Sequence, residues 1–339
     1  MCRINAAIQS EEFRVNKIEV AQFGGPEVLQ YVAGPDPSPA PGQVVVRVHA
    51  AGVNPADTYI RSGTYAFSRP EVPYTPGFDC GGVVHSVGSD VDSLSPGDRV
   101  FVAALGSAHS GAYAELMVCP AHTVRALPDQ VTFEQGAAIG VPCITAYRAL
   151  FQRGGARHGE TVLIHGASGG VGLPAVQMAA AEGLTVIGTA GTAAGRRLVL
   201  DNGAHHVLDH SAPDYLNAVT DLTHGRGADL VIEMLADANL EADLKILAMY
   251  GRVVIVGSRG TIEFTPRLTM VAEADIRGMA VWNMPQAAAG EAMSAVSDYL
   301  ARGVLKPVVG HVFPLREAGV AHETILTAHA AGKMILDCT

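Results

Sequence analysis

The segment from His165 to Gly172, HGASGGVG, carries residues suited to two different chemistries. Around Ser168 the sequence fits G-x-S-x-G, the strained turn that lifts the nucleophile of a hydrolase above its sheet. The glycines of the same segment would instead leave room for the pyrophosphate of a dinucleotide. Both interpretations need a strand before the turn and a helix after it, and TVLI and VGLPAVQMAAAEG are suited to these roles.

The place of this turn in the chain favours the cofactor. In α/β hydrolases several strand-helix units precede the nucleophile and an HGGG-like loop forms the oxyanion hole, whereas here the turn opens the series and no such loop precedes it. Acidic and histidine residues downstream keep a hydrolase triad formally possible, namely Asp209, Asp229, His311 and His322. We predict that Ser168, Gly169, Gly170 and Val171 bind phosphate, with a nucleophilic Ser168 and a purely structural turn as the alternatives.

The second strand of the series indicates which dinucleotide binds. NAD sites carry Asp or Glu about 20 residues beyond the glycine fingerprint, but the segment IGTAGTAAGRR has no carboxylate between Gly183 and Arg197. A 2′-phosphate would meet no repulsion there, and a hydrogen bond from Arg196 or Arg197 would add about 1.5 to 3 kcal/mol. That corresponds to a roughly ten- to hundredfold preference for NADPH. The alternative is a pair of solvated arginines on a helix face.

Two parts of the chain have different periodicities. From about residue 15 to 127, short apolar or alternating runs are separated by Pro and Gly, which predicts a small β-rich, barrel-like domain. After Phe133, strand, glycine turn and helix repeat, which predicts a parallel, doubly wound sheet with helices on both faces. We therefore expect an α/β protein with a β-rich domain at 1–134, completed by 305–339, and a dinucleotide-binding domain at 135–304.

Composition restricts the class of protein. The chain has 339 residues, 48% of them hydrophobic, which is enough for two buried cores. Its 33 acidic and 23 basic side chains give a net charge of −10, which argues against a nucleic-acid backbone as the main ligand. The five cysteines are scattered, the N-terminal segment lacks an apolar core, and no uncharged apolar run reaches about 18 residues. We expect a cytoplasmic protein without a membrane span.

Several motifs resemble one family. The segment GETVLIHGASGGVGLPAVQ, residues 159–177, resembles the signature of the quinone oxidoreductases in the medium-chain dehydrogenase/reductase superfamily. The segments NPADTYIRSGTY, PYTPGFD, QGAAIGVPCITAYRAL, GTAGT, IEMLA, VVIVGSRGTIE and GKMIL are similar to the zeta-crystallin group of NADPH:quinone oxidoreductases. The likeness runs from about Lys17 to Leu336, and Ala180 departs from the Lys, Arg or Ser that the signature expects.

The resemblance implies a fold and an activity. It implies a GroES-like catalytic domain followed by a Rossmann domain, and a zinc-independent enzyme that uses NADPH to reduce quinones, ortho-quinones in particular. Reduction of alkenals or enones by the same hydride chemistry is the alternative. Zeta-crystallin-like proteins also serve as lens crystallins and bind AU-rich RNA, and the acidic balance makes an RNA role secondary at best.

The resemblance also implies site residues. Tyr59 is expected to hydrogen-bond substrate or cofactor and Asn54 to position the substrate oxygen, while packing and turn roles are the alternatives. The remaining expected cofactor contacts are Thr145, Ser168, Gly169, Gly170, Val171, Gly191, Arg196, Arg197, His210, Asn239, Val256, Gly257, Ser258, Met279, Ala280 and Val281. Most of these follow predicted strands, and ligands of open α/β sheets bind at the carboxyl ends of the strands.

The resemblance bears on metal and on partners. Zinc-dependent relatives have Cys where this chain has Asn54, and Gly-His-Glu where it has GFD, residues 77–79. Because thiolate and imidazole ligands are both lost, we expect no metal there. His49 and His85 are expected to be strand or turn residues. Family members assemble through a sheet edge near residues 276–282, so we expect a homo-oligomer, a dimer or a tetramer, acting on a small quinone.

Overall fold

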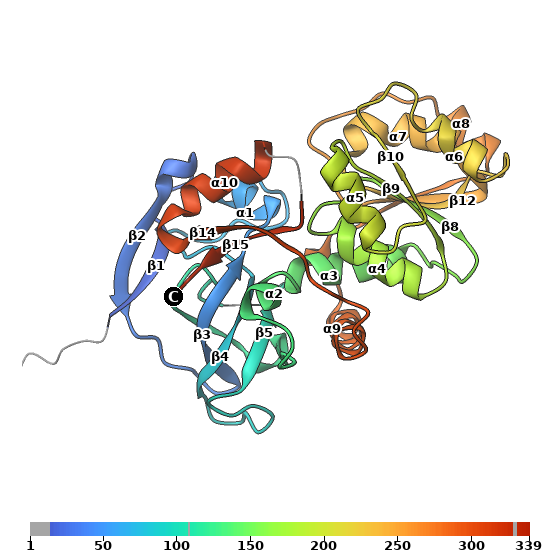
Figure 1. Ribbon diagram of the computed structural model, residues 1–339. Helices are drawn as coiled ribbons and strands as arrows, with labels where there is room; N and C mark the ends of the chain where they lie inside the picture. The colour runs from blue at the N-terminus through green and yellow to red at the C-terminus, as the bar shows by residue number, and fades with distance from the viewer. Residues whose placement is uncertain (1–13, 108, 328–330) are drawn as a thin grey trace, which may run out of the picture.

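The computed structural model describes residues 14–107, 109–327 and 331–339, and two large sheets lie side by side in this part of the chain (Figure 1). The first has the order β14-β15-β3-β4-β5-β7, with β6 paired to β3. Its strands are β3 (Gln43–Gly52), β4 (Asp79–Val87), β5 (Arg99–Ala103), β6 (Leu116–Pro120), β7 (Val124–Ala126), β14 (Val309–Pro314) and β15 (Lys333–Asp337). The hairpin of β1 (Arg14–Val20) and β2 (Leu29–Pro35) is separate.

Short helices surround this first sheet. The α-helices are α1 (Pro55–Arg61), α2 (Phe133–Ala137) and α10 (Ala318–Thr327), and the 3-10 turns are η1 (Pro26–Val28), η2 (Ala121–Thr123) and η5 (Leu315–Glu317). Strand β15 pairs antiparallel with β3, and β14 pairs parallel with β15. The end of the chain therefore returns to a sheet whose other strands come from the first 126 residues.

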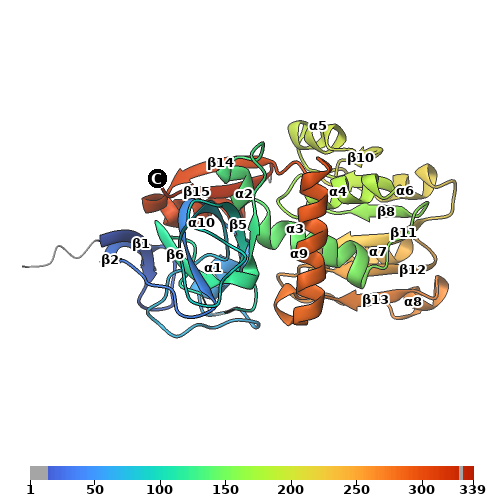
Figure 2. The same ribbon diagram turned by 90° about the horizontal axis from the view of Figure 1, so that it is seen from below.

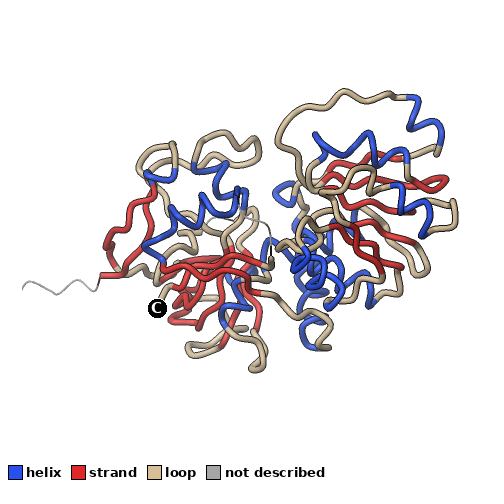
Figure 3. Tube along the Cα trace, turned by 45° about the horizontal axis from the view of Figure 1, so that its top comes forward, coloured by secondary structure: helices blue, strands red, loops and turns tan. Residues whose placement is uncertain are grey.

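The second sheet is parallel, with the order β10-β9-β8-β11-β12-β13. Its strands are β8 (Thr161–Ile164), β9 (Thr185–Thr189), β10 (His206–Leu208), β11 (Ala228–Glu233), β12 (Leu247–Ile255) and β13 (Asp275–Gly278). Numbered along the chain this is the 3-2-1-4-5-6 order of the Rossmann fold, in which ligands bind where the order reverses. The predicted α/β fold, a β-rich domain beside a doubly wound domain, is confirmed, and Figure 3 shows the strands as two separate groups.

Helices cover both faces of the second sheet. They are α3 (Gly140–Tyr147), η3 (Arg148–Arg153), α4 (Gly172–Ala181), α5 (Ala193–Asp201), α6 (Asn217–Leu222), α7 (Ala236–Lys245), α8 (Arg267–Val271), η4 (Val281–Asn283) and α9 (Gln286–Ala301). On β8, Val162 and Ile164 pack into one core and Leu163 into the other. The strand reads as a continuous apolar run because both of its faces are buried. Figure 2 shows α3 and α9 at the junction between the two sheets. No helix of the described residues is long and apolar enough to cross a bilayer.

A buried ion pair ties distant segments together at this junction. Asp79 begins β4 and is fully buried, and Lys333 begins β15 and is 4% exposed, with its Nζ 3.6 Å from Asp79 Oδ2. Asp79 Oδ1 accepts a 2.6 Å hydrogen bond from the N–H of Val141 in α3. A Cβ at Gly140 would clash with the same oxygen, so only glycine fits there. Burial raises the pKa of Asp79 and lowers that of Lys333, and the attraction between the two charges opposes both shifts.

We expect the substitution Lys333→Met to lower the free energy of unfolding by about 3 to 5 kcal/mol, because it leaves a buried carboxylate without its cation. Adding Asp79→Asn should recover part of this loss, since the remaining group is neutral. Lys245→Met is the matched control: this lysine is largely exposed, pairs with Glu241 at 3.1 Å, and should contribute less than about 1 kcal/mol. Urea denaturation followed by circular dichroism measures all four proteins. Equal losses in the two single lysine variants would contradict a stabilising role for the buried pair.

Candidate cofactor and substrate site

The glycine loop forms the turn between β8 and α4. Gly166 has φ +55°, a left-handed conformation that glycine adopts without strain. A Cβ at Gly172 would lie 2.5 Å from the carbonyl oxygen of Gly166, so the turn also needs glycine at the start of α4. The N–H of Val171 donates to no other group among the described residues, whereas the N–H of Gly170 flanks an isolated parallel bridge between Gly169 and Gly332. The Val171 donor lies at the positive end of a ten-residue helix, which is suited to a phosphate anion.

Ser168 lies inside this turn and is 6% exposed. Its carbonyl oxygen accepts the N–H of Gly332 at 2.9 Å, which links the loop to the segment before β15. The serine of a hydrolase triad is activated by a histidine, but no hydrogen bond joins the Ser168 hydroxyl to a histidine in the described part of the chain. The side chain of the nearby His165 points to Asp243 and Glu233 instead. The geometry therefore favours the phosphate-binding interpretation of the loop over the hydrolase.

The ends of β9 and β10 bring further predicted residues together. A Cβ at Gly191 would lie 2.7 Å from Nε2 of His210, so these two predicted residues lie side by side. Arg196 reaches the same edge, where its Nη1 donates to Oδ2 of Asp209 at 2.6 Å. Arg197 instead forms an i,i+4 pair with Asp201 at 2.9 Å, and its side chain is 76% exposed. Of the two arginines, only Arg196 lies beside the predicted adenine ribose site.

The ends of β11, β12 and β13 carry the other predicted contacts. The N–H of Met279 donates to the carbonyl oxygen of Ile255 at 3.1 Å, which sets the segment of Met279, Ala280 and Val281 beside the end of β12. Val256, Gly257 and Ser258 continue directly from β12, and Asn239 lies in the first half of α7. Because parallel strands end at one edge, these residues and the glycine loop lie along the same side of the sheet. Thr145 is buried on α3, at the junction of the two sheets.

Asn54 is held from both sides of its amide. It is 4% exposed; its Nδ2 donates to Asp79 Oδ2 at 2.8 Å, and its Oδ1 accepts from Lys333 Nζ at 2.5 Å. An ammonium only donates and a carboxylate only accepts, so the chemistry of the partners fixes which end of the amide is nitrogen. Asn54 also precedes α1, where its N–H donates to Oδ2 of Asp57. Burial raises the pKa of Asp57 to about 7.

The donor set around Asn54 does not fit a zinc ion. Zinc sites in proteins are built from thiolates, imidazoles and carboxylates, whereas here an amide oxygen and a carboxylate face the Lys333 ammonium. That ammonium supplies the positive charge between the two oxygens and would repel a divalent cation. The residues at this position are therefore unsuited to the metal of the zinc-dependent relatives.

Aromatic rings form a continuous group beside Asn54 and Asp79. Tyr59 of α1 stacks on Tyr65 with centroids 6.1 Å apart, and the indole N–H of Trp282 donates to the Tyr65 hydroxyl at 2.5 Å. Phe78 lies 4.5 Å from Trp282 and 5.1 Å from the ring of His109. We call the six residues Tyr59, Tyr65, Phe67, Phe78, His109 and Trp282 the aromatic wall. It connects loops of the first sheet to η4 of the second.

Four members of the aromatic wall, Phe67, Phe78, His109 and Trp282, were not predicted as site residues. The available signal was Trp282, the single tryptophan of the chain, which directly follows Val281 of a predicted cofactor segment. Burial lowers the pKa of His109 to about 4, and its Nδ1 accepts the N–H of Gly111 at 3.0 Å. The imidazole is therefore neutral near pH 7 with its proton on Nε2.

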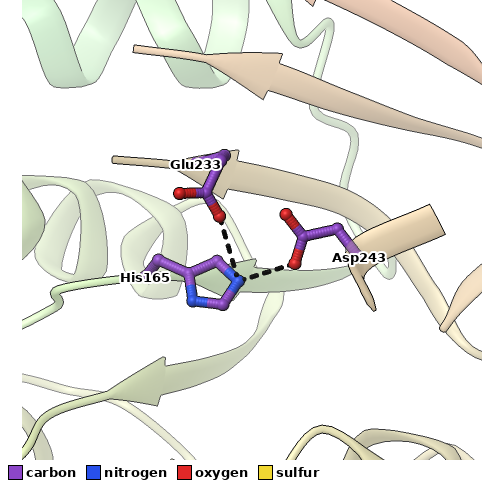
Figure 4. A group of neighbouring side chains, drawn as sticks. All are labelled: His165, Glu233 and Asp243. Atoms are coloured by element: carbon purple, nitrogen blue, oxygen red, sulfur yellow. Dashed lines mark hydrogen bonds and ion pairs between the residues drawn. The ribbon is translucent and has the colours of Figure 1, made fainter. Parts of the chain in front are cut away.

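A second buried cluster lies beneath the glycine loop. His165, Glu233 and Asp243 each offer a ligand atom, and these atoms lie within 4.8 Å of one another, a spacing that metal sites also have. Figure 4 shows both carboxyl groups pointing at the same ring nitrogen: Nε2 of His165 is 2.8 Å from Asp243 Oδ1 and 3.3 Å from Glu233 Oε2. The shorter distance is a hydrogen bond to Asp243 and the longer one an ion-pair contact, so the imidazole N–H lies between the two carboxyl groups.

Comparisons with known proteins identify the family. Residues 40–129 match the model described as an alcohol dehydrogenase GroES-like domain, and residues 170–298 match one described as a zinc-binding dehydrogenase. Human quinone oxidoreductase is 47% identical over 321 residues, covering 94% of this chain and 96% of that protein. Escherichia coli quinone oxidoreductase complexed with NADPH has a TM-score of 0.84 at 32% identity, covering 95% of this chain and 99% of that chain.

The same fold also occurs with the other dinucleotide. A structure described as an NAD-dependent alcohol dehydrogenase has a TM-score of 0.87 at 29% identity and covers 95% of this chain and 99% of that chain. The fold alone therefore does not distinguish an NADPH enzyme from an NAD enzyme. The family is identified by sequence identity over nearly the whole chain. The chain belongs to the quinone oxidoreductases of the medium-chain dehydrogenase/reductase superfamily.

Proposed function

We propose that this protein is an NADPH-dependent oxidoreductase that reduces quinones without zinc. The observation that carries the proposal is the glycine loop, where the unused N–H of Val171 lies at the start of α4. Arg196 lies at the same edge of the sheet and the Asn54 amide lies across the junction from it. The relatives named quinone oxidoreductase, one of them solved with NADPH, support the same activity.

The cofactor residues divide into three groups. Ser168, Gly169, Gly170 and Val171 would bind the pyrophosphate, and Gly191, Arg196 and His210 the adenine ribose and its 2′-phosphate. Arg197, the second arginine of the predicted pair, is exposed and bonded to Asp201, so we assign it no contact. The nicotinamide half would meet Thr145, Asn239, Val256, Gly257, Ser258, Met279, Ala280 and Val281. When bound there, the nicotinamide supplies the hydride.

The substrate side of the site is built from side chains. One hydrogen of the Asn54 Nδ2 is used by Asp79, and the other is available to a quinone oxygen that gains charge as the hydride arrives. We assign the hydroxyl of Tyr59, on the helix that follows Asn54, the role of a second donor. The aromatic wall offers flat apolar surfaces to a planar ring, which favours a quinone, ortho-quinones included, over a linear alkenal.

We also propose how the chain is divided and assembled. The catalytic domain comprises residues 1–134 and 305–339, and the cofactor domain residues 135–304, in a cytoplasmic homo-oligomer, a dimer or a tetramer. Strand β13 is an edge strand of its sheet, and exposed apolar side chains lie on it or on neighbouring segments: Tyr250, Met270, Val271 and Ile276. An exposed edge with apolar neighbours suits pairing with a second copy of the chain.

Oxidation of NADPH in the presence of an ortho-quinone tests the proposed function. We expect turnover with NADPH that exceeds turnover with NADH and is unchanged by excess chelator, because the Lys333 ammonium and not a metal faces Asn54. An enone assayed in parallel measures the alternative substrate class. Absence of turnover with either dinucleotide, or loss of activity on chelation with recovery on adding zinc, would contradict the proposal.

The arginine pair offers a matched test of cofactor choice. Arg196→Ala should reduce the preference for NADPH over NADH, measured as the ratio of kcat/KM values, by roughly ten- to hundredfold, because a charge-assisted hydrogen bond is lost. Arg197→Ala should leave the ratio unchanged, since this side chain is exposed and paired with Asp201. An unchanged ratio in the Arg196 variant would remove this residue from the 2′-phosphate site.

A further inference from the structure

The proposed function leaves the cluster of His165, Glu233 and Asp243 without a role. Building on that function, we propose that Glu233 is a positioning residue for the cofactor: it fixes the amide of Asn239, and it does so only while it shares a proton with Asp243. Neither carboxyl group touches the cofactor in this proposal. Their effect passes through Asn239 and through the loop after β11.

Glu233 anchors the end of β11 through one oxygen. Its Oε1 accepts the N–H of Leu235 and also the Nδ2 of Asn239, at 3.2 Å for the latter. Because this carboxyl oxygen only accepts, the Asn239 amide nitrogen must face Glu233, and the amide oxygen is left for a donor on the ligand. The cofactor offers such donors in its ribose hydroxyls and its carboxamide N–H₂. Glu233 therefore determines which end of the Asn239 amide the cofactor meets.

The cluster needs one more proton than the imidazole can provide. Glu233 and Asp243 are both fully buried, and Glu233 Oε2 and Asp243 Oδ2 have no hydrogen-bond partner in the described part of the chain. Nε2 of His165 carries at most one hydrogen, although both carboxyl groups face it (Figure 4). A proton on Glu233 Oε2 allows a hydrogen bond between the two carboxyl groups and leaves Oε1 free to accept from Asn239.

The other titratable group that faces the cluster among the described residues is Tyr215. Its hydroxyl lies 3.4 Å from Nδ1 of His165, and burial raises its pKa, so it stays protonated and can donate to that nitrogen. Burial is also the main cause that raises the pKa values of Glu233 and Asp243 to about 7, and it lowers the pKa of His165. No positive charge is therefore available to compensate a second carboxylate.

The sign of the pH effect depends on this proton. Below about pH 7 the carboxyl pair is protonated and Glu233 holds Asn239; above it the pair becomes two buried anions that repel each other. Cofactor affinity should then fall as the pH rises. Because linkage is reciprocal, cofactor binding at neutral to alkaline pH should take up protons.

The test is a titration of the 339-residue chain with NADPH, followed by the fluorescence of Trp282, its single tryptophan. The dissociation constant of the unmodified protein should rise about tenfold between about pH 6 and about pH 8. In Asp243→Asn the amide N–H₂ donates to Glu233 at every pH, so this variant should lack the tenfold rise. The ratio of the dissociation constants of the unmodified protein and the variant should therefore increase about tenfold from about pH 6 to about pH 8. Taking this ratio cancels ionisation of the 2′-phosphate itself. Glu241→Gln, on the same helix and outside the cluster, should retain the full pH dependence.

A second pair of variants separates positioning from folding. Glu233→Gln keeps an oxygen for Asn239 and should bind NADPH like the protonated protein, whereas Glu233→Leu should bind weakly at every pH. Calorimetry of the unmodified protein in two buffers of different ionisation enthalpy measures proton uptake without any substitution. Binding with no proton uptake, or an Asp243 variant with unchanged pH dependence, would overturn the inference alone. Absence of NADPH binding at any pH would overturn the proposed function with it.

Discussion

The ion pair of Asp79 and Lys333 is the constraint on which both halves of the site depend. A buried carboxylate is costly unless a cation and hydrogen bonds compensate it, and Asp79 receives all of them: the Lys333 ammonium, the Asn54 amide and the N–H of Val141. Because the partners of the Asp79 carboxylate lie on or next to α1, α3 and β15, these contacts fix the three elements relative to β4. The residue before Lys333 bonds to Ser168, so the position of the glycine loop is connected to the same pair.

The two sides of the site use different parts of the chain. The proposed phosphate contacts are largely backbone N–H groups, which depend on glycines such as Gly166 and Gly172 for their geometry. The proposed substrate contacts are side chains, and the aromatic wall draws them from both domains. Cofactor binding is therefore set by the conformation of a turn, whereas substrate choice depends on residues such as Phe78 and Trp282 that can be exchanged without altering the turn.

Features that depend on local order were predictable from the sequence. Strand and helix alternation after Phe133 indicated the Rossmann sheet, which the structure confirms, and it placed the predicted cofactor residues after strands because parallel strands end at one edge. Contacts across long separations were not predictable in this way. Lys333 reaches Asn54 across 279 positions, and Arg196 pairs with Asp209 at the end of the neighbouring strand. The aromatic wall likewise combines α1, two loops of the first domain and η4, so periodicity gave no sign of it, and the roles of its members remain predictions.

The position of β15 has a consequence for biosynthesis. Domains generally fold in the order in which the ribosome releases them, but β3 acquires its neighbour β15 only after the whole Rossmann sheet has been made. Until then the last residues of β3, 50–52, lack their partner strand, since β6 pairs only with residues 43–47, and Asp79 has no cation. We therefore expect the second domain, whose six strands are contiguous in sequence, to be the first unit to complete its fold on the ribosome, with the first domain closing last around Lys333.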